Sequence, residues 1–181
     1  FTPGRIIDAK NLAAAITKNP AAYADVINRC LPQVDAATAD LRSIYLGLKG
    51  LLPDAQLPQI YMVVGAGNSG GTADANAQVL GLEVICAENQ TPEKFRQALR
   101  YFFAHETVHT LQATPAESDK SPLFTSILQE GAADFIATLI TGEQSSPERD
   151  AWATPREQTL WTALKADLAS PNPPAGRWIY N

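Results

Sequence analysis

Apolar residues recur at helical intervals through the first third of the chain. The pattern covers three segments: Asp8 to Lys18, Asn19 to about Cys30, and Pro32 to Lys49. Prolines stand at or near the starts of the second and third segments, and Gly50 follows the last, as is typical of helix limits. We therefore predict three helices that form a scaffold over residues 1–50.

The pattern changes over residues 51–90. Gln59–Val64 and Gln78–Cys86 are runs of β-forming residues bounded by proline and glycine, and they predict two strands of a small sheet. The loop between them, residues 65–77, is rich in Gly, Asn and Ser. It either frames a cleft or forms a flexible surface connection, and the sequence leaves both open.

Two longer helices are predicted in the second half of the chain. The first runs from about Pro92 to Gln112, with Thr91 placed to cap it. The second begins at Pro122 and ends at Gly142. On the first helix, four residues recur at helical spacing and predict a stripe that faces inward: Ala98, Phe102, His105 and His109.

A shorter helix is predicted near the C-terminus. Thr154 and Glu157 have the spacing of a capping box, which would open a helix that reaches about Leu168. The proline-rich residues 169–181 are predicted to be extended.

Composition limits the class of protein and its partners. The chain has 181 residues, of which 45% are hydrophobic and 18% charged, as expected for one globular domain with a substantial core. The net charge of -5 argues against nucleic acid and anionic membranes as partners, and no run approaches the length of a transmembrane helix. The chain begins at Phe1 without methionine or a signal-like segment, so we expect a processed or excised form. Few lysines and many small polar residues suggest an exported protein, periplasmic or extracellular.

Cys30 and Cys86 are the two cysteines of the chain. In an oxidising compartment they would form a disulfide that ties the N-terminal helices to the sheet, and we expect this pairing. In the cytosol they would be buried thiols.

The sequence His105-Glu106-Thr107-Val108-His109 carries the clearest chemistry. On a helix, side chains four residues apart project from one face, so both imidazoles can bind one ion while Glu106 lies beside its open position. These are the only histidines in the chain, so a third protein ligand has to be a carboxylate or a cysteine. The alternative is a chance match in which the histidines are merely hydrogen-bonded.

Two carboxylates on the second long helix can complete such a site. Glu130 and Asp134 share one face of an apolar helix, where burial without partners is costly. We expect Glu130 to be the third ligand and Asp134 to accept a hydrogen bond from His105 or His109. Asp134 as the ligand is an open alternative, and so is a solvated face that binds no metal.

His105-Glu106-x-x-His109 followed by Glu130-x-x-x-Asp134 resembles the gluzincins, the thermolysin-like clan of zinc peptidases. The motifs are closer still to a bacterial family of predicted zinc-dependent proteases, in which H-E-x-x-H is followed by E-G-x-A-D. The resemblance covers roughly residues 58–141. It implies a mainly helical α+β fold with a zincin-like core, in which a small sheet packs on the H-E-x-x-H helix and a second helix bears a ligand.

The resemblance also implies an arrangement of the whole chain. We expect a single metallopeptidase domain over residues 1–181, with a catalytic core at 58–141 and a C-terminal helix and tail at 145–181. Relatives are expected to continue past this tail, so we expect a truncated chain.

The implied activity is hydrolysis of peptide bonds in a peptide or protein substrate. One Zn²⁺ per chain would be held by the two histidines and Glu130, with Glu106 as general base. The substrate would pair with the second strand, at Leu80, Gly81 and Leu82. Four residues are candidates to donate to the oxyanion, the first two foremost: Tyr180, Arg177, Arg156 and Tyr101.

Two other functions remain open. A domain that keeps the zinc but binds a partner without cutting it would fit the lack of a third histidine. A helical domain with no metal would fit a chance motif. The sequence leaves the substrate preference and the oligomeric state undetermined.

Overall fold

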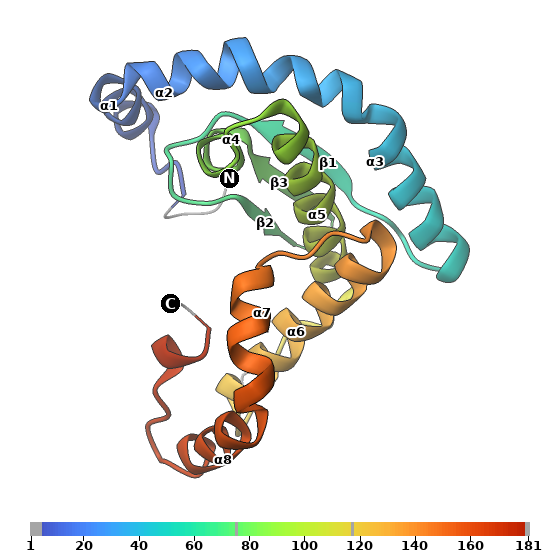
Figure 1. Ribbon diagram of the computed structural model, residues 1–181, viewed down its shortest axis with the longest axis vertical. Helices are drawn as coiled ribbons and strands as arrows, with labels where there is room; N and C mark the ends of the chain where they lie inside the picture. The colour runs from blue at the N-terminus through green and yellow to red at the C-terminus, as the bar shows by residue number, and fades with distance from the viewer. Residues whose placement is uncertain (1–4, 75, 117, 180–181) are drawn as a thin grey trace.

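The computed structural model describes residues 5–74, 76–116 and 118–179. Figure 1 shows a long arc of N-terminal helices over a small sheet and, below them, a second group of helices that ends near the C-terminus. The predicted class, α+β and mainly helical, is confirmed.

The N-terminal scaffold is helical as predicted. It consists of α1 (Ala9–Lys18), α2 (Pro20–Asp25), a π-helical segment η1 (Val26–Cys30) and α3 (Leu31–Leu51). Asp8 caps α1 by accepting a 2.7 Å hydrogen bond from the backbone N–H of Asn11. Pro32 lies in the first turn of α3, where the missing N–H of proline costs that helix no hydrogen bond.

The sheet has three strands, β1 (Gln59–Val63), β2 (Gly71–Ala73) and β3 (Ala77–Gly81), in the order β1-β3-β2. β3 pairs parallel with β1 and antiparallel with β2. The prediction that a strand continues to Cys86 is wrong, because α4 (Leu82–Glu88) begins directly after β3. β1 ends opposite Gly81, so the backbone beyond that point has no strand to pair with and forms helical hydrogen bonds instead.

The expected substrate strand at Leu80, Gly81 and Leu82 is also wrong. β3 is the central strand and both of its edges are already paired. Leu80 and Leu82 are 0% and 1% exposed, and Leu82 belongs to α4. The sheet has a free edge on β2 instead, within the loop for which the sequence left two interpretations open.

The remaining helices are α5 (Pro92–Leu111), α6 (Pro122–Thr141), α7 (Pro147–Ala153), the 3₁₀ turn η2 (Thr154–Arg156), α8 (Glu157–Leu168) and the 3₁₀ turn η3 (Ala175–Arg177). Thr91 caps α5 as predicted, and Gly142 ends α6 with a φ of 72° that favours glycine. The predicted capping box is wrong: α7 runs directly into η2 and α8, so the Thr154 hydroxyl donates back to the Asp150 carbonyl.

The core lies between α3, α4, α5 and the sheet. The face of α5 that carries Phe95, Leu99 and Phe103 is fully or almost fully buried there, whereas the stripe of Ala98, Phe102 and the two histidines is only partly buried. This stripe therefore lies beside the core face of α5, at its border with the α6 side of the helix.

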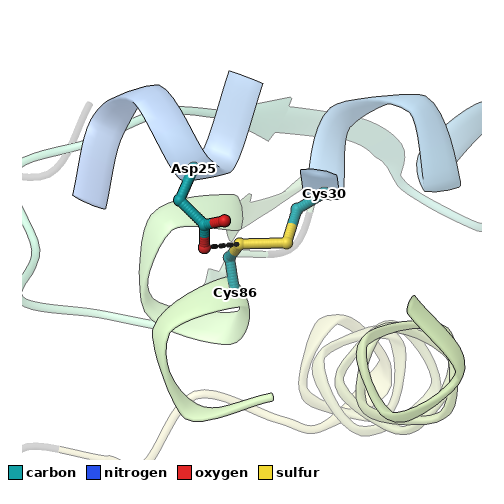
Figure 2. A group of neighbouring side chains, drawn as sticks. All are labelled: Asp25, Cys30 and Cys86. Carbon is teal, nitrogen blue, oxygen red and sulfur yellow. Dashed lines mark hydrogen bonds between the residues drawn. A yellow bond between two sulfur atoms is a disulfide. The ribbon is translucent and has the colours of Figure 1, made fainter. Parts of the chain in front are cut away.

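Cys30 and Cys86 form a disulfide that joins η1 to α4, the helix that follows the sheet (Figure 2). Asp25 lies beside the two sulfur atoms, and the three side chains are close enough to share an ion. The Arg29 guanidinium forms an ion pair with the Asp25 carboxylate, with 2.5 Å between nitrogen and oxygen. It also donates a hydrogen bond to the Cys86 carbonyl. With the sulfurs bonded to each other and a cation in place, this cluster is structural.

Replacing both cysteines with alanine should lower the free energy of unfolding by about 4 kcal/mol, because the unfolded chain regains the freedom lost in closing a loop of 56 residues. Urea unfolding followed by circular dichroism measures the change. A reducing agent should destabilise the wild type similarly and leave the double variant unaffected. Equal urea midpoints for the two proteins would contradict the prediction.

Candidate metal centre

The two histidines lie near the C-terminal end of α5 and meet Glu130 of α6. The Nε2 atoms of His105 and His109 are 3.0 Å apart, because one helical turn separates the two rings. One carboxylate oxygen of Glu130 lies 3.3 Å from the first of these nitrogens and 3.4 Å from the second. Three donor atoms therefore form a nearly equilateral triangle.

The triangle has the size that a tetrahedral zinc site requires. Bonds of about 2.0–2.1 Å to a tetrahedral ion keep neighbouring ligand atoms about 3.3 Å apart. Two imidazoles and one carboxylate, with the fourth position open, are also a known donor set of catalytic zinc. Glu130, rather than Asp134, completes the triangle, since Asp134 lies at the other nitrogen of His105.

Asp134 contacts His105, but the predicted hydrogen bond from the ring N–H is not formed. Its Oδ1 is 3.0 Å from Nδ1 of His105, although the carboxylate lies off the ideal direction of the ring N–H. The Tyr101 hydroxyl donates to the same oxygen, and Arg149 lies 3.2 Å from the other. Sequence reasoning missed the contact of Arg149. Tyr101 stands one turn before His105 on α5, a spacing that could have indicated its role.

Gln112 fixes the second histidine, and sequence reasoning missed it. Its side-chain oxygen lies 2.8 Å from Nδ1 of His109. An amide oxygen only accepts, so Nδ1 carries a hydrogen and Nε2 is the nitrogen that faces Glu130, as a donor while the ring is protonated. The Gln112 amide also donates to the carbonyl of Gln129, next to Glu130. The one available signal was the position of Gln112, three residues after His109.

Two buried polar side chains hold α5 against the sheet. Gln78 of β3 donates to the Phe103 carbonyl at 2.9 Å and accepts from the Thr107 hydroxyl at 2.8 Å. Both side chains are 0% exposed, so these hydrogen bonds are shielded from water. These hydrogen bonds fix α5 relative to the sheet on both sides of His105, at Phe103 and at Thr107.

Glu106 is buried, with an exposed fraction of 8%, and lies against the backbone of β2. A Cβ atom on Gly71 would fall 2.3 Å from its carboxylate, so only glycine permits this approach. The glycine-rich loop therefore frames the site, which is one of the two interpretations that the sequence left open. Burial raises the pKa of Glu106, although the two nearby histidines oppose the shift.

In the metal-free protein the carboxylates and imidazoles stabilise one another's charges. Burial alone would lower the pKa of His105, but the adjacent carboxylates of Asp134 and Glu130 raise it to about 9. Hydrogen bonds from both histidines lower the pKa of Glu130 to about 2. The same half-buried negative charge that raises the proton affinity of the imidazoles also favours a cation at this position.

Three of the four expected oxyanion donors form hydrogen bonds with other parts of the protein. Tyr180 lies outside the described residues. Arg177 donates to Asp167 and is held against α8, and Arg156 donates to the Trp152 carbonyl. Tyr101 donates to Asp134, as described above.

Gln112→Ala should weaken zinc binding about tenfold, because His109 loses the acceptor that orients it. Gln112→Glu keeps an acceptor at this position and should retain most of the affinity. Competition with a chromophoric chelator measures both. Gln97→Ala, on an exposed position of the same helix, is the matched control. Equal affinities for wild type and Gln112→Ala would contradict the assigned role.

The metal-free protein should lose stability, and gain zinc affinity, as the pH rises. The folded pKa of His105, about 9, lies above its ordinary value of 6.5. Its stabilising contribution is therefore complete below pH 6.5 and lost as the pH passes about 9. Over the same range zinc affinity should rise by up to about tenfold per pH unit, since fewer protons are displaced. Thermal unfolding with a chelator and zinc titrations at several pH values test both trends, and opposite slopes would refute them.

Comparison with protein-family models, with curated proteins and with solved structures found no match to this chain. The interpretation of the site therefore depends on its own residues and their geometry.

Proposed function

We propose that this protein is a zinc-dependent peptidase in which Glu106 acts as the general base. The observation that carries the proposal is the triangle of donor atoms from His105, His109 and Glu130, with edges of 3.0, 3.3 and 3.4 Å. A solvated face or a chance motif gives no reason for three such atoms from two helices to converge.

Zinc bound at this triangle would supply the charge that lowers the pKa of water toward about 7 and polarises a substrate carbonyl. Glu106 takes the proton of the attacking water and passes it to the leaving amine. Its burial and raised pKa suit this role, because a base with a pKa nearer to neutrality can accept and release a proton in one cycle. Asp134 and Gln112 keep the imidazoles in orientation.

The free edge of β2 is the candidate binding strand for an extended substrate. Gly70 and Asp74, at its two ends, hydrogen-bond β3 through the pairs with Gly81 and Ala77. In an antiparallel ladder such pairs alternate, so the backbone groups of Gly71 and Ala73 face the free edge. This edge lies next to Glu106, and a peptide paired with it would pass beside the base.

Arg149 is an additional candidate to stabilise the oxyanion. Asp134 holds its guanidinium at the site, at 3.2 Å, while 54% of the side chain remains exposed. A partly exposed cation can reach a bound substrate without a change in the fold.

The disulfide supports the proposal that the protein works in an oxidising compartment, outside the cytosol.

Glu106→Gln should reduce peptide hydrolysis by about a hundredfold to ten-thousandfold while the protein keeps stoichiometric zinc, since only the base is lost. Glu130→Gln should lose both zinc and activity. Elemental analysis and cleavage of a quenched fluorescent peptide library measure the two properties. Glu93→Gln, exposed in the first turn of α5, is the matched control.

Hydrolysis that persists unchanged in Glu106→Gln would refute the proposed base. A wild type that holds zinc but cleaves no peptide would favour a zinc-containing binding module instead.

A further inference from the structure

α6 carries an apolar face that no other element covers in the part of the chain that the structure describes. Four large side chains on it are exposed by 38%, 55%, 65% and 68%, respectively: Phe124, Leu128, Phe135 and Leu139. At 100° per residue they fall, together with Gly131 and Ala132, within an arc of about 100°, and no polar residue lies in that arc. We call these six residues the outer face of α6.

The opposite side of the helix is already occupied. Leu123, Ala133 and Ala137 are buried there, and Glu130 and Asp134 contact the histidines of α5. The outer face is therefore not required by the proposed metal centre. A contiguous exposed apolar surface of this kind marks an interaction site more often than chance.

The outer face is symmetric about its own midpoint, between Gly131 and Ala132. Leu128 and Phe135 lie equally far from this point on either side, and so do Phe124 and Leu139. When such a helix crosses a second copy of itself antiparallel, each phenylalanine faces a leucine and the two small residues meet at the centre. An interface around a two-fold axis requires this kind of self-complementary surface.

We propose that the protein forms a homodimer in which the outer faces of two α6 helices pack antiparallel. This inference goes beyond the proposed function and does not depend on it.

The area available is sufficient for the centre of such an interface. With about 200 Å² for a fully exposed large apolar side chain, the four exposed fractions amount to roughly 450 Å² per copy. Two copies bury about 900 Å² of apolar surface before any rim residue is counted, and stable interfaces start at roughly 1,000 Å² in total.

Charge at the ends of α6 favours the same arrangement. Lys120 precedes the helix and Glu143 follows it, at equal distances from the midpoint. Antiparallel packing brings the lysine of one copy to the end of the partner helix that carries the glutamate, which already lies 3.6 Å from Arg100 of its own chain. The helix dipoles also oppose each other in this orientation, which is favourable.

A lipid bilayer is a weaker candidate for the same face. An 18-residue window of the 20-residue helix α6 has a mean hydropathy of 1.3, so by length and composition alone α6 could cross a membrane, contrary to the expectation that no run approaches that length. However, Glu130 and Asp134 project from its middle toward the histidines, and the net charge of the chain is -5. Both carboxylates and the net charge disfavour insertion and adsorption to an anionic surface.

Sedimentation equilibrium of the full chain tests the proposal. At about 100 µM the wild type should have twice the monomer mass of 19.5 kDa. Phe135→Glu should raise the dimer dissociation constant about a hundredfold or more, because two charges are buried at the centre of the interface. Gly131→Arg should have a similar effect through steric exclusion.

Both substitutions are expected to fold, which circular dichroism and thermal unfolding check. Phe135 is exposed, and a Cβ at Gly131 meets no atom within 4 Å. Gly47 of α3 is equally open, so Gly47→Arg is the matched control and should remain dimeric.

A monomeric wild type, or dimers that persist in both variants, would overturn the proposal. Flotation with vesicles of phosphatidylcholine and phosphatidylglycerol identifies the competing occupant. A wild type that is monomeric and floats, while Phe135→Glu does not, would assign the outer face to a membrane.

Discussion

The structure depends on the contact at which Glu130 and Asp134 of α6 meet the two imidazoles of α5. Two carboxylates in so apolar a helix are costly to bury without partners, and two imidazoles 3.0 Å apart cannot both carry a positive charge cheaply. Each pair relieves the cost of the other, which is why the pKa of Glu130 falls to about 2 while that of His105 rises to about 9. A divalent cation would replace the shared protons without a rearrangement of the helices.

The rest of the fold keeps this contact in place by fixing α5. Phe95, Leu99 and Phe103 pack one face of the helix into the core, and Gln78 holds its backbone and Thr107 from the sheet. A third side of α5 approaches β2 so closely that glycine is required opposite Glu106. Because α5 is packed on three sides, the side chains that it contributes to the site have little conformational freedom: Tyr101, His105, Glu106 and His109. A catalytic or binding site requires such rigidity.

α6 is packed on one side, is exposed on the other, and combines two roles. One side supplies Glu130 and Asp134, and the hydrogen bond from Gln112 to the Gln129 carbonyl links the end of α5 to the turn that precedes the first of them. The other side presents the exposed apolar outer face. Packing of a second copy there would restrain the helix from the side that the chain leaves open, so dimerisation and the geometry of the metal centre would be mechanically connected.

The sequence by itself determined most of the helices, their limits and the three residues that converge at the candidate metal centre. Helical periodicity and local capping residues such as Thr91 act within a few residues, and the spacing of His105 and His109 fixes their relative position on any helix. Glu130 and Asp134 were predicted to join the histidines because two carboxylates in an apolar helix are costly to bury without partners.

Only the tertiary structure decided where β3 ends and that β3 is the central strand, which leaves free edges on β1 and β2. The apolar run from Leu80 to Cys86 suits a buried strand and a buried helix equally well, and the end of β1 at Val63 selects the helix after Gly81. The sequence also did not indicate the contacts of Gln78, Gln112 and Arg149. Their partners lie on other elements or across a turn, and polar side chains acquire such roles from the neighbours that the fold brings to them.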